Sequence, residues 1–361
     1  MILRLRYCLL LLLCIASPVA AQTCRVVGYF PWWESDVSSI EYERLTNVLY
    51  FALEVTAAGD LVDSNINYTR LHAVRDRAHA AGASMGICVG GWLTNGGFSP
   101  MAADPTARAH FIEHIRDFCL EHDLDGVDLD WEPVETADDR DNYSLLLKEL
   151  SEVLSPLGKG TSVAVAAGSE NIHAWVAPHL DWVAVMAYDM GYPHSSLDDA
   201  TWALANWRDA YGFPSEKLVL GVPFYGRNGS NTSWTYSSIV ATWNPVPAQN
   251  WTGENWDIFF NGRDLVETKV QYVLDNGFGG VMIWALGYDA PGEASLLAAM
   301  DGVNGACAGD INGDCVVDGG DLGILLGLWG ADRTSEADLN GDGITNGADL
   351  GLLTVFWGPC S

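Results

Sequence analysis

The sequence predicts an α/β fold, a (β/α)8 TIM barrel, followed by a small all-α module. Short apolar β runs alternate with helical patterns over residues 22–300, and several of these runs are apolar at every position. This alternation is typical of parallel strands that helices cover. After residue 306 an acidic pattern repeats at a spacing of 28 residues, which indicates a duplicated unit outside the barrel.

The chain is expected to begin with a signal peptide, residues 1–21. Arg4 and Arg6 precede the apolar run Leu9–Ile15, and small residues follow it. This is the order of a secretory signal, and the apolar run is too short to span a bilayer. We therefore expect a secreted, extracellular protein with no membrane span.

Six cysteines remain after that signal, and export permits disulfides between them. Their connectivity does not follow from the sequence. Cys88 and Cys119 lie in apolar strand-like and helix-like contexts, so we expect them to be free, buried thiols. Cys307 and Cys360 bracket the C-terminal module and are a candidate pair.

Eight runs rich in Val, Ile, Leu and aromatic residues are the predicted barrel strands. They are Arg25–Phe30, Asn47–Leu53, Ser84–Val89, Gly126–Trp131, Ser162–Ala167, Trp182–Tyr188, Leu218–Phe224 and Gly280–Ala285. The predicted helices are Tyr68–Ala81, Ala107–His122, Arg140–Leu154, Leu197–Tyr211, Asp264–Asn276 and Gly292–Met300, with short ones after the first and fifth strands. An open doubly wound sheet is the alternative, but its glycine-rich phosphate turn is missing after the first strand.

The formal net charge of −29 argues against nucleic acid or an anionic membrane as a partner, because both require basic patches. The negative charge favours a neutral substrate or cations as partners. The 15 tryptophans suit stacking on the apolar faces of sugar rings, although tryptophan is also a common core residue.

The strongest chemical motif is Asp125-Gly-Val-Asp-Leu-Asp-Trp-Glu132. In a strand, Asp128, Asp130 and Glu132 share one face, and the C-terminal ends of barrel strands carry the active site. Like charges that are clustered in a pocket raise the pKa of at least one of the carboxyl groups. That carboxyl group then stays protonated near neutral pH and can donate its proton. A solvated acidic turn would not explain the apolar residues interleaved with the acids. A divalent-metal site would require histidine or further oxygen ligands nearby.

This motif resembles the signature of glycoside hydrolase family 18, to which many chitinases belong. Six further stretches, in the order of the barrel, resemble strands of that family: Val27–Trp33, Leu45–Ala52, Cys88–Trp92, Met186–Asp189, Lys217–Arg227 and Gly279–Trp284. The resemblance covers nearly the whole barrel. It departs at Cys88, where the family usually has serine, so that a hydroxyl hydrogen bond would be lost. About 50 residues between the last two strands are too few for the full α+β insertion of deep-cleft relatives, which implies a shallower groove.

The resemblance implies substrate-assisted, retaining hydrolysis without a cofactor. Glu132 would protonate the leaving oxygen and later activate water, while the acetamide oxygen of the substrate forms an oxazolinium ion. Asp130 would hold the acetamide N–H, and Asp128 would share a proton with Asp130. Tyr188 would orient the acetamide, and Asp189 would contact the distorted sugar. The implied substrate-binding residues are Trp284 as an apolar floor, Tyr29, Phe51, Trp92, Met186, Tyr225 and Arg227.

Three functions fit these residues. The first is hydrolysis of β-1,4 linkages in chitin or chitooligosaccharides. The second is an endo-β-N-acetylglucosaminidase activity on N-glycans or peptidoglycan, and the third is a non-hydrolytic chitin-binding lectin. The presence of Glu132 argues against the lectin, and the sequence does not separate the first two.

Residues 301–306 form the predicted linker, and 307–361 the C-terminal module. Oxygen side chains recur at loop positions 1, 3, 5, 9 and 12, as in calcium loops of the EF-hand type. They are Asp310, Asn312, Asp314, Asp318 and Asp321, then Asp338, Asn340, Asp342, Asn346 and Asp349. Apolar helix-like runs, Leu322–Trp329 and Leu350–Trp357, follow the loops. The module resembles a dockerin, which implies two structural Ca²⁺ ions and a cohesin-like protein partner, although Gly319-Gly320 and Gly347-Ala348 replace the usual Ser/Thr recognition pairs.

Overall fold

The computed structural model describes residues 25–34, 36–92, 96–253, 256–304, 309–312, 316–330, 337–340 and 343–359. The predicted signal peptide lies outside these residues. So do four of the cysteines and two of the predicted calcium ligands: Cys24, Cys307, Cys315, Cys360, Asp314 and Asp342.

Within the described residues, eight parallel strands form a closed barrel, which confirms the predicted fold. Their order is β1-β12-β8-β7-β6-β5-β4-β2, and β1 pairs with β2 to close the ring. The strands are β1 (Arg25–Pro31), β2 (Asn47–Val55), β4 (Ser84–Gly90), β5 (Gly126–Asp130), β6 (Gly160–Ala166), β7 (Val183–Met186), β8 (Leu218–Pro223) and β12 (Gly280–Trp284). Short β3 (Leu61–Val62) pairs antiparallel with the end of β2.

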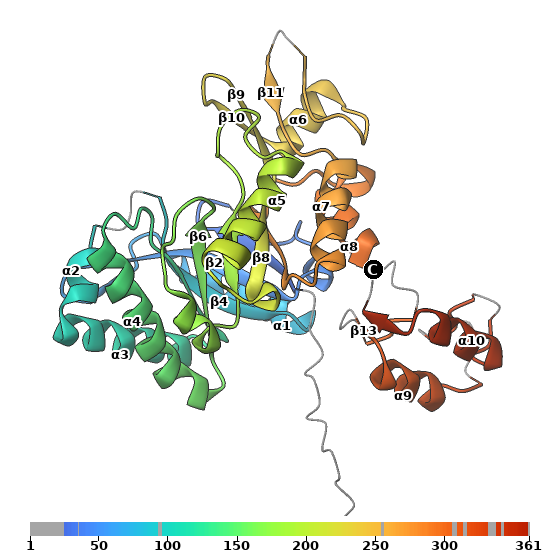
Figure 1. Ribbon diagram of the computed structural model, residues 1–361, viewed down its shortest axis with the longest axis horizontal. Coiled ribbons are helices and arrows are strands. Elements are labelled where there is room, and N and C mark those ends of the chain that lie inside the picture. The colour runs from blue at the N-terminus through green and yellow to red at the C-terminus, as the bar shows by residue number, and fades with distance from the viewer. Residues whose placement is uncertain are drawn as a thin grey trace, which may run out of the picture.

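Helices cover the outside of this barrel, and α3 and α4 lie side by side on it (Figure 1). They are α1 (Tyr68–Ala80), α2 (Phe98–Ala103), α3 (Pro105–Glu121), α4 (Ala137–Leu154), α5 (Leu197–Ala205), α7 (Arg263–Asp275) and α8 (Leu296–Asn304). Single 3₁₀ turns follow the first and fifth barrel strands, where short helices were predicted: Tyr42–Arg44 and Ala174–His179. Two details differ from prediction: α2 was not expected, and α8 includes 301–304 of the predicted linker. None of the helices in the described ranges has the length and apolarity to cross a membrane.

Side chains on the barrel strands alternate between two apolar clusters. Val27, Leu49 and Met282 belong to the smaller cluster inside the barrel, while Trp131 packs in the larger cluster between strands and helices. Trp131 stacks on Phe98 with ring centroids 5.2 Å apart. The acids that alternate with these apolar residues in β5 therefore point inward, as predicted.

The segment between β8 and β12 is a small subdomain. It contains β9 (Tyr225–Asn228), β10 (Ser233–Thr235), α6 (Tyr236–Trp243) and β11 (Ile258–Phe259), and its strands form an antiparallel sheet in the order β10-β9-β11. Trp234 and Trp243 pack against the core, whereas Trp256 is exposed. Some tryptophan side chains of this subdomain therefore pack against the core, and at least one faces solvent.

The C-terminal module contains α9 (Gly319–Gly327), α10 (Gly347–Val355) and an antiparallel pair, β13 (Val316–Val317) with β14 (Gly358–Pro359). The predicted all-α description is thus incomplete. Both helices begin three residues before the predicted runs. The reason is that Asp318 and Asn346 cap them and form capping boxes with Asp321 and Asp349.

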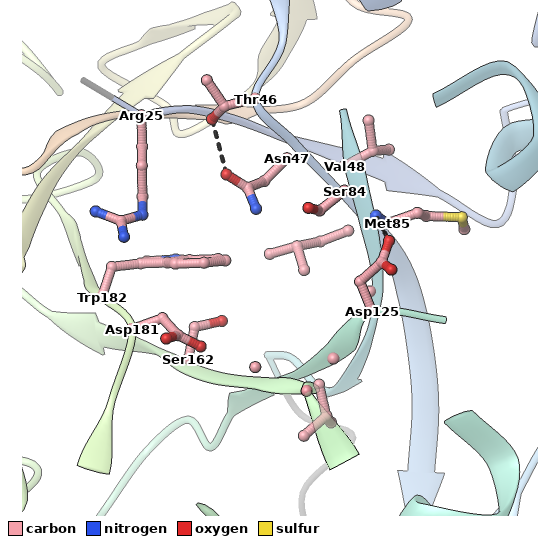
Figure 2. A pocket seen from close by; sticks show the side chains of 16 residues that line it. Arg25, Thr46, Asn47, Val48, Ser84, Met85, Asp125, Ser162, Asp181 and Trp182 are labelled. Atoms are coloured by element: carbon pink, nitrogen blue, oxygen red, sulfur yellow. Dashed lines mark hydrogen bonds between the residues drawn. The ribbon is translucent and has the colours of Figure 1, made fainter. Parts of the chain in front are cut away.

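A hollow of about 430 Å³ opens at the end of the barrel where its strands begin (Figure 2). Two of its acids accept backbone amides of neighbouring strands: Asp125 binds the Met85 N–H and Asp181 binds the Thr161 N–H, at 2.7 and 2.8 Å. The Arg25 guanidinium lies over the ring of Trp182, which also lines the hollow. These contacts tie strand ends together, and the catalytic candidates lie at the opposite end of the strands.

Candidate active site

Asp128 is fully buried inside the barrel and accepts three hydrogen bonds. The Tyr29 hydroxyl donates to Oδ2 at 2.7 Å, the Ser162 hydroxyl donates to Oδ1 at 2.6 Å, and the Cys88 thiol donates to Oδ2 at 3.5 Å. Burial raises the pKa of Asp128 to about 6, although these three donors lower it. The thiol at position 88 therefore keeps a hydrogen bond that the departure from serine was expected to remove. Both Cys88 and Cys119 are free and buried, as predicted.

Asp130 and Glu132 lie close enough for each to influence the protonation of the other. Burial, followed by the charge of Glu132, raises the pKa of Asp130 well above its usual range, and burial raises the pKa of Glu132 to about 7. We expected Asp130 to share a proton with Asp128, and the charge of Asp128 also raises the pKa of Asp130, after burial and the charge of Glu132. The Oδ1 atom of Asp130 is buried and has no hydrogen-bond partner within the described residues. One acceptor of this carboxyl is thus available to a ligand.

Asp189 follows β7 and is held by three side chains. Its φ of 59° is a left-handed conformation that aspartate tolerates better than most residues. The Tyr225 hydroxyl donates to Oδ2 at 2.9 Å, Arg227 Nη2 pairs with the same oxygen at 2.7 Å, and His194 Nδ1 lies 3.1 Å from Oδ1. Tyr225 and Arg227, which we expected to bind substrate, therefore position Asp189.

Aromatic rings form an apolar wall beside the acids. The Trp284 ring lies 4.7 Å from that of Phe51 and 5.6 Å from that of Tyr29. Half-exposed Trp33, which the sequence analysis did not select, contacts both Phe51 and Trp284. A partly exposed aromatic surface of this kind can carry the apolar face of a sugar ring.

Three other predicted residues have different surroundings. Met186 is buried in the cluster inside the barrel that also contains Tyr29 and Phe51. Tyr188 packs edge-on against Tyr225, and burial raises its pKa well above the usual range, so its hydroxyl remains a donor. Trp92 is 65 % exposed, and no ring contact joins it to the wall in the part of the chain that the structure describes.

Several residues of the site were missed because they depend on tertiary contacts. Ser162 lies opposite Asp128 in the register of β5 and β6, so strand alignment could have revealed it. His194 lies in an irregular loop, and no sequence pattern marked it. The same loop is anchored by Lys269 of α7, a fully buried lysine.

The Lys269 ammonium donates to the Ser195 carbonyl at 3.1 Å, the Ser195 hydroxyl at 2.8 Å and Asn261 Oδ1 at 2.6 Å. Burial lowers the pKa of Lys269 to about 7. Because Ser195 is next to His194, and His194 contacts Asp189, the lysine fixes the loop that carries Asp189.

We predict that Lys269→Ala lowers the free energy of unfolding by about 2 kcal/mol or more. The change leaves a cavity and removes the donor from buried acceptors. Lys269→Met keeps the apolar stem and should cost less. Chemical denaturation of the three proteins measures the difference, and an alanine variant as stable as the original would contradict the anchoring role.

In each of the two C-terminal loops, the last predicted ligand accepts backbone N–H groups of its own loop. Asp321 Oδ1 accepts the N–H groups of Ile311 and Asn312 at 2.7 and 3.0 Å, and its Oδ2 accepts the Asp318 N–H at 2.9 Å. In the second loop, Asp349 accepts the N–H groups of Asn340 and Asn346 at 3.1 and 2.7 Å. The predicted ligands Asp310 and Asp338, which lie among the described residues, start the two loops, and each predicted ligand side chain offers an oxygen atom, the donor that a hard cation such as Ca²⁺ prefers.

Comparison with known proteins agrees with this geometry. The sequence model described as "Glycosyl hydrolases family 18" matches residues 25–289. The crystal structure of the GH18 chitinase ChiB from Flavobacterium johnsoniae aligns at a TM-score of 0.69 and 30 % identity, covering 78 % of this chain and 93 % of that one. A chitinase structure from Rhizomucor miehei aligns at a TM-score of 0.64 and 27 % identity, covering 77 % of this chain and 99 % of that one.

Curated relatives include "Chitinase A1" of Niallia circulans, which is 27 % identical over 76 % of this chain and 58 % of its own length. "Probable chitinase 10" of Drosophila melanogaster is 27 % identical over 62 % of this chain and 12 % of its own length. The chain thus spans less than two thirds of the length of these two relatives.

Proposed function

Because the chain belongs to glycosyl hydrolases family 18, we propose that it is a chitinase-like glycoside hydrolase that cleaves β-1,4 linkages in chitin or its oligosaccharides. The observation that carries the proposal is the state of Glu132 just after β5. Burial raises its pKa to about 7, so a large fraction is protonated at neutral pH. A carboxylic acid in this state can protonate a glycosidic oxygen. Relatives named as chitinases support the choice of substrate.

In the proposed mechanism, Glu132 donates its proton to the leaving oxygen while the substrate's own acetamide oxygen attacks the anomeric carbon. Glu132, now a carboxylate, then takes a proton from the water that opens the oxazolinium ion. The unpartnered Oδ1 of Asp130 supports a role in accepting the acetamide N–H. The Tyr188 hydroxyl would orient the acetamide oxygen, and Trp284 would support the sugar ring.

Asp128 takes a supporting role in this scheme. Its three donors favour the ionised carboxylate, and a negative charge below Asp130 would stabilise positive charge that develops at the reacting sugar. Asp189, held by Tyr225 and Arg227, would contact the sugar at the rim.

We predict that kcat/KM falls as pH rises through about 7, because Glu132 must be protonated to act as the acid. The negative charge of Asp189 contributes to the raised pKa of Glu132. Asp189→Asn should therefore shift this basic limb to lower pH, whatever its effect on the rate. pH–rate profiles of the original protein and of Asp189→Asn on chitin oligomers measure the basic limb of each protein. A basic limb that is not shifted in the variant would contradict the influence of Asp189 on the pKa of Glu132.

The experiment that tests the function is product analysis on chitin oligomers, N-glycans and peptidoglycan side by side. Cleavage of chitin oligomers with little action on the other two is expected. Preferential release from N-glycans or peptidoglycan would instead identify an endo-β-N-acetylglucosaminidase. Binding of chitin without any product would identify a lectin.

We further propose that the protein is secreted and that residues 307–361 form a dockerin-like module holding two Ca²⁺ ions for a cohesin-like partner. The repeated oxygen ligands and the matched contacts of Asp321 and Asp349 support the metal. The described core of this module is small, consisting of Val317, Leu325, Ala337 and Leu353 with flanking residues. Small cores rarely suffice alone, so bound metal would supply folding free energy.

Calorimetry should show two Ca²⁺ bound per chain, and deletion of residues 305–361 should abolish both. EGTA should loosen the C-terminal module while hydrolysis of soluble chitin oligomers persists, because the catalytic candidates all precede Met300. Disulfides could mask the loosening, so oxidised and reduced protein are both measured. Equal loss of hydrolysis in EGTA would contradict the independence of the two parts.

A further inference from the structure

A second cluster of ligating side chains lies away from the acids of β5, where the β2–β3 hairpin meets α3. It consists of Asp60, His110 and His114, and one ligand atom of each residue lies within 4.8 Å of the other two. His110 Nε2 is 3.0 Å from Asp60 Oδ1, and the two imidazole rings have centroids 3.9 Å apart. Neither the sequence motifs nor the proposed hydrolysis uses these residues.

The backbone holds the three side chains on rigid supports. Residues four apart share one face of a helix, and α3 is anchored by the fully buried Phe111 and Ile115, so its two histidines have fixed positions. The hairpin packs directly on this helix: a β-carbon on Gly59 would lie 2.2 Å from the Ala107 carbonyl oxygen.

The hairpin turn also orients the carboxylate. The Thr56 hydroxyl accepts the Asp60 N–H at 3.1 Å and donates to Asp60 Oδ2 at 3.3 Å. This leaves Oδ1 directed at His110. A geometry set by the fold before any ligand arrives lowers the cost of binding one.

We propose that Asp60, His110 and His114 bind one divalent transition-metal ion, of which Zn²⁺ is the appropriate probe. Two imidazoles and one carboxylate are a common ligand set for zinc, with water in the fourth position. Ligands around a tetrahedral zinc are about 3.3 Å apart, so ligand atoms that now lie within 4.8 Å of one another would move closer by up to about 1.5 Å. Ca²⁺ and Mg²⁺ prefer oxygen ligands and would bind poorly here.

The location suggests what the metal would do. The hairpin continues from the C-terminal end of β2, the strand that carries Phe51 of the aromatic wall. Bound metal would clamp the hairpin to α3 at the same end of the barrel as the proposed active site. Asp60 and His110 are partly exposed, so solvent can reach the site, and the net charge of −29 attracts cations.

The test is calorimetric titration of the full chain, made without a polyhistidine tag, with Zn²⁺ in the presence of excess Ca²⁺. The excess Ca²⁺ occupies the acidic C-terminal loops. His114→Gln and Asp60→Asn should each weaken binding of one Zn²⁺ by about tenfold or more, since even partners outside the ligand shell contribute 10–100-fold. Co²⁺ should give the strong visible absorption of a four-coordinate ion in the original protein and lose it in both variants.

His173→Gln is the matched control, because His173 forms a comparable exposed pair with Asp141 at 2.6 Å. This variant should bind Zn²⁺ like the original protein. The proposal is overturned if the original, His114→Gln and Asp60→Asn proteins bind Zn²⁺ equally, which would make the cluster only an ion pair beside a second, tilted imidazole. It is also overturned if His173→Gln lowers binding as much as His114→Gln.

Discussion

Replacing Glu132 with glutamine should lower the rate of chitin-oligomer hydrolysis at least about 10²-fold and leave oligomer binding largely intact. The amide is nearly the same size as the carboxyl but carries no transferable proton, and general acid–base catalysis contributes about 10²–10⁴-fold. Burial, which raises the pKa of Glu132 to about 7, is what makes this carboxyl an acid at neutral pH. Single-turnover kinetics and oligomer binding to the same variant measure the two effects separately.

Glu135→Gln is a matched control for this experiment. Glu135 lies three residues further along the same loop but is exposed to solvent, and it should keep the original rate. Near-original hydrolysis in Glu132→Gln would disprove the assignment of the acid. Equal losses in both variants would point to damage of the loop rather than loss of a proton donor.

Much of the barrel was predictable because its strands carry a strong local signal. A strand buried on both faces is apolar at nearly every position, and acids that interrupt such a run must share one face. The row Asp128, Asp130 and Glu132 therefore followed from spacing alone, as did the outward packing of Trp131.

The partners of these acids were not predictable in the same way. Ser162 reaches Asp128 only because β6 aligns with β5 in a particular register, and His194 reaches Asp189 through an irregular loop. The relative influence of Glu132 and Asp128 on the pKa of Asp130 depends on side-chain packing. The cis peptide bonds after Phe51 and Trp284 likewise have no signature in the residue pattern.

The predicted starts of the C-terminal helices were wrong because polar capping residues outweighed the low helix propensity of the residues in the first turn. Gly319-Gly320 disfavours a helix, and the predicted apolar run began only at Leu322. In the structure, Asp318 and Asp321 satisfy the free amides of the first turn, and Leu325 is buried in the module core. Capping and burial together exceed the cost of two glycines, so the helix begins at the cap.

The second large effect concerns the substrate. Fully deacetylated chitosan should not be cleaved, whereas chitin oligomers of the same length are, because the acetamide oxygen is the proposed nucleophile. A well-placed internal nucleophile can have an effective molarity of about 10⁵–10⁸ M, so its loss outweighs any gain in solubility. Product analysis of matched acetylated and deacetylated oligomers measures the difference.

The surroundings of the carboxylates explain why none of them would serve as the nucleophile in place of the acetamide oxygen of the substrate. Among the described residues of the site, Asp128 is fully buried beneath three donors, and Asp189 is paired with Arg227. Burial and the charge of Glu132 raise the pKa of Asp130 well above its usual range, which disfavours the charged carboxylate that a nucleophile requires. None of the three is therefore prepared to form a glycosyl ester.

The stereochemistry of the product provides the control. Two successive displacements at the anomeric carbon retain its configuration, so NMR should detect the β-anomer first, before mutarotation. The α-anomer first would indicate a single displacement by water and would contradict the acetamide mechanism. Cleavage of fully deacetylated chitosan with β-anomer first would instead require a protein nucleophile, and Asp130→Asn would then be the variant to examine, since its Oδ1 is the buried acceptor without a partner in the described chain.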